Sequence, residues 1–307
     1  MLKKIFFAAV VAIATLTSCT ENKPVDIKVV SFNIRGCRYG KNGEIKQDGP
    51  NHWEYRKASV VKFIEDEMPD LLGMQEVLTH QADTLKARIP SCYTLYSIDR
   101  VSGEPTGPEE AMTICYRNDR FTEVAKGTFW LSETPDTPSK GWDAECYRTV
   151  SWAHLKDKLN DNKDVLFFNT HFDHIGETAR VEAGKLIIDR AKEILGVTGD
   201  IGPAMEKKGA SIFVTGDFNC QIGTPSLVHL YNNFDYAREK APITDSHHTY
   251  NGWTTDKNDP VAGKHMNVID HIFFAGAVAN EYKTVLDGYG VPFISDHYPI
   301  MLKATIK

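Results

Sequence analysis

The chain has 307 residues, of which 42% are hydrophobic and 25% are charged, and its formal net charge is −6. These are ordinary values for a globular protein. The acidic balance, with no cluster of more than two lysines or arginines, argues against a protein that grips long nucleic acid by its phosphates. An enzyme of this charge can still cleave phosphoesters if bound cations supply a local positive field, and it suits short or small substrates.

The first residues have the features of an export signal. Lys3 and Lys4 precede an apolar run over residues 5–16, which is shorter than the roughly 20 residues that span a membrane core. The segment from Leu16 to Cys19 resembles a bacterial lipobox, which implies cleavage before Cys19 and diacylation of its sulfur. We predict a signal peptide over residues 1–18, a tether over residues 19–26, and an exported lipoprotein at the periplasmic face or cell surface. The alternative is a plain signal peptide with an incidental cysteine.

Beyond the tether, strand-like and helix-like segments alternate along the chain. Strands are predicted over residues 26–35, 70–75, 93–98, 111–116, 121–131, 147–156, 164–169, 211–215, 267–275, 281–286 and 298–305, and helices over residues 55–67, 79–88 and 179–195. Several strands are apolar on both faces, which is typical of a layered α/β protein with two packed sheets. No linker interrupts residues 27–307, so one domain is expected.

Besides Cys19, the chain has five cysteines that lack the close pairs of a zinc site: Cys37, Cys92, Cys115, Cys146 and Cys220. An exported location permits disulfides, but an odd number leaves at least one thiol unpaired within the chain. A domain of this size does not need disulfides for stability. We interpret these cysteines as mostly buried free thiols.

Polar residues that end apolar segments carry the functional information. A buried strand aims its last side chains at a cleft, and the following loop gives ligands access to them. Six such places occur: Asn33, Glu76, the run from Asn169 to His174, Asp217 with Asn219, Asp270-His271 and Asp296-His297. Taken singly, each is more often a turn residue than a ligand. Their number and their common position at segment ends are what point to a site.

The residue types in this set indicate metal-assisted hydrolysis of a phosphoester. Several carboxylates in one cleft raise each other's pKa unless a cation lies among them. Oxygen ligands almost without thiolates favour Mg²⁺ or Mn²⁺, with Ca²⁺ as a further possibility. Histidines beside carboxylates suit proton transfer or the stabilisation of a developing anion.

The ordered set of these six motifs resembles the endonuclease/exonuclease/phosphatase superfamily over essentially all of residues 27–307. With Arg35, Arg148 and Arg180 it is similar to a branch of exported bacterial members. The resemblance implies an α/β four-layer sandwich, in which two packed mixed β-sheets are flanked by helices as in pancreatic deoxyribonuclease. The chain lacks the tyrosine-bearing segment of the apurinic endonucleases, which argues against cleavage at abasic sites.

The resemblance also implies a role for each site residue. Glu76 would be the principal metal ligand, with Asn33 and Asp296 near it. The proposed catalytic residues are Asp217 for the attacking water, Asn219 for the scissile phosphate, His171 and His297 for the developing charge, and Asp270 as the partner of His297. The proposed substrate contacts are Arg35, Arg148, Asp173 and His271.

The sequence leaves the substrate open. A phosphodiester and a phosphomonoester both fit, and the substrate could be a nucleic-acid fragment, a phospholipid or sphingolipid headgroup, or a small phosphorylated compound. No obligate protein partner is evident, and the membrane is contacted through acylated Cys19. One alternative is a catalytically silent relative that binds a phosphorylated ligand or glycan at the cell surface. Another is a zinc protein that uses His171, His174 and His271.

Overall fold

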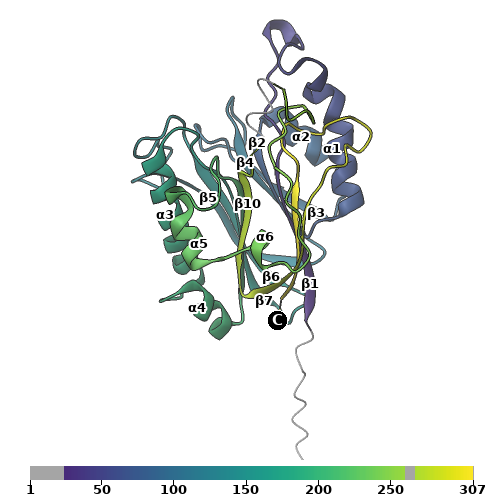
Figure 1. Ribbon diagram of the computed structural model, residues 1–307. Coiled ribbons are helices and arrows are strands. Elements are labelled where there is room, and N and C mark those ends of the chain that lie inside the picture. Colours follow the sequence, from purple (N-terminus) through teal and green to yellow (C-terminus); the bar gives the residue numbers. More distant parts are fainter. Residues whose placement is uncertain (1–23, 260–266, 307) are drawn as a thin grey trace, which may run out of the picture.

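Two six-stranded β-sheets pack face to face, and helices cover the outer face of each sheet (Figure 1). The computed structural model describes residues 24–259 and 267–306. The four-layer α/β sandwich with two mixed sheets is therefore confirmed.

The first sheet has the strand order β11-β12-β1-β2-β4-β3. Its strands are β1 (Val25–Asn33), β2 (Leu71–Val77), β3 (Tyr93–Tyr96), β4 (Ala111–Arg117), β11 (Ala277–Thr284) and β12 (Ile300–Ile306). Strands β1 and β2 are parallel, and the other neighbours are antiparallel. Helices α1 (Trp53–Glu67) and α2 (Thr79–Arg88) cover the outer face.

The second sheet has the order β5-β6-β7-β8-β10-β9 and repeats this plan, with one parallel pair, β7 and β8, between antiparallel neighbours. Its strands are β5 (Phe121–Trp130), β6 (Thr149–Asp157), β7 (Lys163–His171), β8 (Ser211–Asp217), β9 (Asp235–Tyr236) and β10 (Asp270–Ala275). The helices that follow its strands are α3 (Glu177–Leu195), α4 (Ile201–Lys208), α5 (Val228–Asn233) and α6 (Ala237–Lys240). Three short 3-10 helices span Lys41–Gly43, Gly49–Asn51 and Pro225–Leu227.

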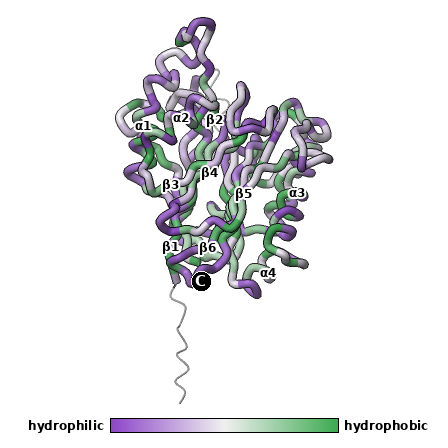
Figure 2. The backbone as a smooth tube through the Cα atoms, turned by 180° about the vertical axis from the view of Figure 1, so that it is seen from behind, coloured by the Kyte–Doolittle hydropathy of each residue, from purple (hydrophilic) through white to green (hydrophobic). Residues whose placement is uncertain are grey.

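Three apolar clusters correspond to the three interfaces between the four layers. The middle cluster joins the two sheets and contains Phe167 and Phe213, which are fully buried. Strand β8 has no exposed residue because one face meets the first sheet and the other meets α3 and α4. In Figure 2 the central strands carry hydrophobic stretches, whereas the loops at the end of the molecule near α1 and α2 are largely hydrophilic.

A polar joint interrupts the apolar middle layer near one edge. The side chain of Asn169, fully buried on β7, donates hydrogen bonds to the carbonyl oxygens of Met74 (2.8 Å) and Thr113 (3.0 Å) in the other sheet. Its own oxygen accepts hydrogen bonds from Gln75 Nε2 (2.6 Å) and Thr215 Oγ1 (3.1 Å). All hydrogen-bonding groups of this amide are satisfied, so burying it carries no penalty for an unpaired polar group.

The strands and three helices expected from the sequence are present, with ends that shift by a few residues. Strand β1 starts at Val25, within the predicted tether, because Val25 and Asp26 pair with Ile306 and Thr305. Helices α4, α5 and α6 and the two-residue strand β9 were not predicted, because each is short. The predicted signal peptide and Cys19 lie outside the described residues.

Two further observations concern the state of the cysteines and the presence of a membrane-spanning helix. Cys37, Cys92, Cys115, Cys146 and Cys220 are all free, and three of them are buried. Among residues 24–259 and 267–306, no helix has both the length and the apolar character needed to cross a membrane.

Gly73 allows the two sheets to approach at the joint, and its replacement tests this constraint. A Cβ atom at Gly73 would lie 2.2 Å from Thr215 Oγ1 and 2.4 Å from Asn169 Oδ1. We expect Gly73→Ala to lower the free energy of unfolding by about 1–3 kcal/mol or more, measured by urea denaturation. Gly202→Ala is the matched control, because a Cβ at Gly202 meets no atom within 4 Å. Equal stability of the two variants would contradict the proposed joint.

Candidate active site

A cleft of about 620 Å³ opens where the carboxyl ends of the two parallel strand pairs meet. Most of the predicted site residues line it: Arg35, Glu76, Arg148, His171, Asp217, Asn219, Asp296 and His297. They come from loops and strand ends that are far apart in the sequence. The topology brings them together because β1, β2, β7 and β8 all end at this edge of the sandwich.

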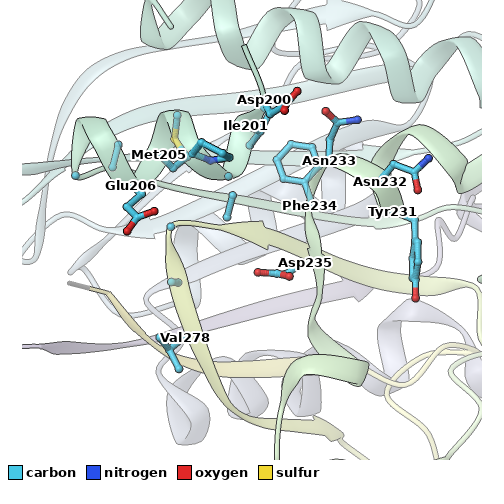
Figure 3. Close-up of a pocket in the computed structure, with 17 residues that line it drawn as sticks. Asp200, Ile201, Met205, Glu206, Tyr231, Asn232, Asn233, Phe234, Asp235 and Val278 are labelled. Carbon is cyan, nitrogen blue, oxygen red and sulfur yellow. The ribbon is translucent and has the colours of Figure 1, made fainter. Parts of the chain in front are cut away.

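A second cavity, of about 630 Å³, lies at the opposite ends of β8 and β10 (Figure 3). Asp200, Glu206, Asp235 and Phe234 are among the residues that line it. Its lining contains no histidine, lysine or arginine that could transfer a proton to a phosphoester or bind a phosphate. We therefore place the chemistry in the first cleft.

Three residues of the cleft adopt left-handed backbone conformations, which are rare for residues other than glycine. Their φ angles are 60° at Arg35, 61° at Glu76 and 52° at Asn219. Glu76 also lies where the pairing of β2 with β4 shifts register, between Met74 and Val77, so the strand bends at its end. Each such conformation costs of order 1–3 kcal/mol, and such strain is concentrated at functional sites.

Asn33 lies between two carboxylates at the bottom of the cleft. Its Nδ2 donates to Glu76 Oε1 (2.9 Å) and to Asp217 Oδ2 (3.0 Å). Its side-chain oxygen accepts the backbone N–H of Arg35 (2.9 Å). Asn33 thus bridges the two carboxylates, and because its oxygen has a second lone pair, its role as a metal ligand stays a prediction.

Asp217 is the centre of the site, because both histidines that were predicted to be catalytic face it. Its Oδ2 lies 3.5 Å from His171 Nε2 and 3.7 Å from His297 Nε2. Burial, and then the negative charge of Asp270, raise the pKa of Asp217 to about 7. This carboxylate can therefore exchange a proton close to neutral pH.

His297 and Asp270 form the predicted pair, with 2.9 Å between His297 Nδ1 and Asp270 Oδ2. Burial opposes the positive charge of His297, but the negative charges of Asp270 and Asp217 outweigh it. Together with the hydrogen bond to Asp270, they raise the pKa of His297 to about 10. The imidazolium is therefore the form of His297 at neutral pH.

His171 is the electrostatic opposite of His297. Burial, and then the positive charges of Arg148 and Arg100, hold the pKa of His171 well below its ordinary value. Asn219 Nδ2 lies 2.9 Å from His171 Nε2, which accepts a hydrogen bond in the neutral ring, and the backbone N–H of Asn219 donates to Asp217 Oδ1 (3.0 Å). The buried Nδ1 of His171 has no hydrogen-bond partner within the described part of the chain. Of these two histidines, His297 is thus charged and His171 neutral at neutral pH.

The acidic residues of the cleft fit a hard divalent cation. Ligand atoms of Glu76, His171 and Asp217 lie within 4.8 Å of one another. Burial opposes ionisation of Glu76, but Arg35 and the hydrogen bond from Asn33 lower its pKa below the ordinary value. Burial, together with the charge of Glu76, raises the pKa of Asp296. A cation among these oxygens would relieve that repulsion.

Two predicted substrate contacts do not reach the cleft. His271 is fully buried, with Nδ1 3.1 Å from the Tyr236 hydroxyl and Nε2 2.8 Å from the Cys220 carbonyl oxygen. Asp173 accepts hydrogen bonds from the backbone N–H groups of Ile175 (3.0 Å) and Gly176 (2.8 Å), so it stabilises its own loop. Because both ring nitrogens of His271 are engaged, the three-histidine zinc alternative also lacks one of its ligands.

Seven residues that line the cleft are not among the predicted site residues, and of these only His174 was named as a possible ligand, in the zinc alternative: Arg100, Glu110, Cys146, His174, Tyr250, Asn267 and Ile269. Arg100 and Glu110 lie at the two ends of the loop between β3 and β4, and His174 and Tyr250 lie at the rim. Glu110 directly precedes the apolar strand β4, a position that could have identified it. Burial, and then the charge of Glu76, raise the pKa of Glu110. No pattern in the surrounding sequence singles out Arg100 or Tyr250.

Known proteins share this fold and are similar in sequence. The sequence pattern of the Endonuclease/Exonuclease/phosphatase family matches residues 30–297. The structure of an endonuclease/exonuclease/phosphatase from Bacteroides vulgatus is 32% identical, with a TM-score of 0.78 over 92% of this chain and 100% of that chain. A mannosyl-6-phosphatase from Bacteroides thetaiotaomicron is 31% identical, with a TM-score of 0.75 over 91% and 99% of the two chains. An uncharacterised protein of Acanthamoeba polyphaga mimivirus is 27% identical over 81% of this chain and 91% of its own.

The Asp270–His297 pair predicts a specific pH dependence of stability. Because the pKa of folded His297 is raised to about 10, its stabilisation is fully present below the unfolded value of roughly 6.5 and is lost as the pH rises through 10. We expect wild type to exceed Asp270→Asn in melting temperature most at pH 6, and this difference to shrink towards pH 10. Thermal unfolding in the presence of chelator, at matched ionic strength, measures this difference in melting temperature. A difference that stays constant with pH would exclude a charged His297.

Proposed function

The chain belongs to the endonuclease/exonuclease/phosphatase family, and from this premise we propose that it is a divalent-metal-dependent phosphatase of small phosphorylated carbohydrates. The observation that carries the proposal is the composition of one cleft. Carboxylates suited to a cation, a charged and a neutral histidine, and arginines suited to phosphate all face the same space of about 620 Å³. We infer hydrolysis of the phosphoric ester bond from this combination.

Glu76, Asn33 and Asp296 are the residues proposed to hold the metal, with Mg²⁺ or Mn²⁺ as its identity. The bound ion would supply Lewis-acid polarisation of the phosphoryl oxygens. Arg35 lies 3.7 Å from Asp296 and 3.2 Å from Asp48, so it keeps the Asp296 carboxylate oriented. We assign Arg35 this orienting role as well as its predicted contact with substrate.

The chain's own residues account for the proton and charge changes of hydrolysis. Asp217, with its pKa raised to about 7, would orient the attacking water and accept its proton. The amide of Asn219 and the neutral ring of His171 would hold the phosphoryl oxygens. The imidazolium of His297, fixed by Asp270, would stabilise the negative charge that develops on the phosphoryl group.

A small substrate fits the dimensions of the cleft and the charge of the chain. A cleft of about 620 Å³ is in the range of small-molecule sites, and the net charge of −6 disfavours a long polyanion. Tyr250 and Asn267 line the cleft, and an aromatic face beside an amide can hold a sugar ring and its hydroxyls. The 31% identical mannosyl-6-phosphatase supports a phosphorylated carbohydrate as the substrate class.

We also propose that the enzyme is an exported lipoprotein anchored at Cys19, and the position of the cleft then favours a soluble substrate. Six residue steps separate Cys19 from Val25, and even fully extended they reach about 21 Å. The nine residues of β1 carry the chain from Val25 to Asn33 over roughly 26 Å. The tether is thus shorter than the distance from its attachment point to the cleft. This supports a soluble substrate over a headgroup in the same membrane.

Metal removal and replacement of Glu76 test the reaction. We expect EDTA to abolish phosphate release from mannose 6-phosphate and from p-nitrophenyl phosphate, and Mg²⁺ or Mn²⁺ to restore it. Glu76→Ala should lower kcat/KM by about 100-fold or more, because the cation loses its main carboxylate. Glu206→Ala, an exposed residue of the distant cavity, is the matched control. Full activity in chelator would contradict the metal mechanism.

His297→Ala tests the charged histidine and separates an enzyme from a binding protein. Loss of one stabilising group for the developing charge should lower kcat by about 10²–10³-fold, while circular dichroism shows an intact fold. A folded wild type that binds metal and phosphosugars but hydrolyses no phosphoester would favour the alternative, a silent relative that binds its ligand at the cell surface. The substrate panel should include single-stranded DNA, RNA, sphingomyelin and phosphatidylinositol phosphates.

A further inference from the structure

Two buried arginines lie beside His171 in the cleft, and the proposed reaction gives them no role. Arg100 comes from the loop after β3 and Arg148 directly precedes β6, and they are 9% and 6% exposed. Together with His174 at the rim they form a basic corner of the cleft. Glu76 and Asp296, the proposed metal ligands, belong to the acidic part of the same cleft.

Arg148 is held in a fixed orientation by its neighbours Asp173 and His174. Its Nε lies 3.3 Å from Asp173 Oδ2, and its Nη2 lies 3.1 Å from His174 Nδ1. The same Asp173 oxygen also accepts the backbone N–H of Cys146 at 3.1 Å. The Asp173 carboxylate therefore shares its charge with the backbone and holds the guanidinium in place. These contacts engage Nε and Nη2 of Arg148, and they do not involve Nη1.

Arg100 is held in a similar way. Its Nη1 lies 2.7 Å from Glu110 Oε2, and its carbonyl oxygen accepts a hydrogen bond from Trp130 Nε1 at 2.7 Å. Glu110 is itself close to Glu76, and this repulsion, added to burial, disfavours its charged form. Arg100 Nη2 also lies 3.5 Å from Glu109 Oε2, but Arg38 contacts the same oxygen at 2.9 Å, so the positive charge of Arg100 is only partly neutralised. Arg148 and Arg100 are the leading charges that disfavour a protonated His171, so their field reaches the place where a phosphoryl oxygen would lie.

We propose that Arg100 and Arg148 determine specificity by recognising the second negative charge of a phosphomonoester. Near neutral pH a monoester carries close to two negative charges, whereas a diester carries one. An oxygen of the dianion can accept hydrogen bonds from a guanidinium, but the same position in a diester is occupied by an ester substituent that offers no charge. This inference rests on the proposed function, and it assigns the choice between monoester and diester to named residues.

Arg35 does not share this role, although it lines the same cleft. Its Nε and Nη2 each lie 3.2 Å from Asp48 oxygens, and its Nη1 lies 3.7 Å from Asp296. All its guanidinium nitrogens therefore face carboxylates. The positive charge of Arg35 stabilises the acidic part of the cleft. It is therefore not available to bind the second negative charge of the substrate.

The test compares two substrates that share one leaving group, p-nitrophenyl phosphate and methyl p-nitrophenyl phosphate. For Arg148→Met and Arg100→Met we expect kcat/KM on the monoester to fall by about 10- to 100-fold, with little change on the diester. Arg148→Lys should recover part of the monoester activity, because it restores the charge without the planar fork. Arg117→Met is the control, since Arg117 pairs with Asp119 at the far end of β4.

The outcomes separate this inference from the proposed function. An equal fall on both substrates would overturn it, because the arginines would then serve hydrolysis in general. If wild type hydrolyses neither substrate, the proposed function fails, and calorimetry with inorganic phosphate and dimethyl phosphate still decides the inference. Arg148→Met should bind phosphate more weakly than wild type and dimethyl phosphate equally well. Unchanged phosphate binding in Arg148→Met would reject the specificity role.

Discussion

The hydrogen bonds of Asn169 across the two sheets are the constraint on which the rest of the site depends. This one amide contacts β2 and β4 in the first sheet and β8 in its own. It lies two residues before His171 on β7, and its partner Gln75 lies next to Glu76. A shift of one sheet against the other would break these bonds in a buried layer, where unpaired polar groups are costly. The joint therefore fixes the distance between the side of the cleft that carries Glu76 and the side that carries His171.

The charges at this edge are stable only as a set. Three carboxylates of the site, Asp217, Asp270 and Asp296, are buried and Glu76 is half-buried, and buried charges are costly unless they are paired. Asn33 donates to two of them, and Asp270 is neutralised by the imidazolium of His297. The left-handed backbone at Arg35, Glu76 and Asn219 adds strain to the same place. Such an arrangement lowers stability and is expected where a cation and a phosphate complete the charge balance.

The sequence predicts the strands and the polar ends of strands well, because apolar runs and the polar residue that ends each run are both local features. It cannot tell which side of a sheet such a residue faces. His271 follows Asp270 on β10, and successive side chains point to opposite faces, so His271 contacts Tyr236 and Cys220 instead of the cleft. Arg100 was missed because its position depends on contacts with Glu110 and Trp130, which no local sequence pattern reveals.

The separation of charge within the cleft explains how an acidic protein can act on an anion. The net charge of −6 repels polyanions at long range, and salt screens this field over roughly 10 Å. Inside the cleft, the positive charges of Arg100, Arg148 and His297 act at short range in a medium that screens them poorly. A small dianion experiences mainly the local field, whereas a long polyanion also experiences the acidic surface. The proposed selectivity for a small, doubly charged phosphoester would thus follow from the same distribution of charge that is proposed to hold the metal.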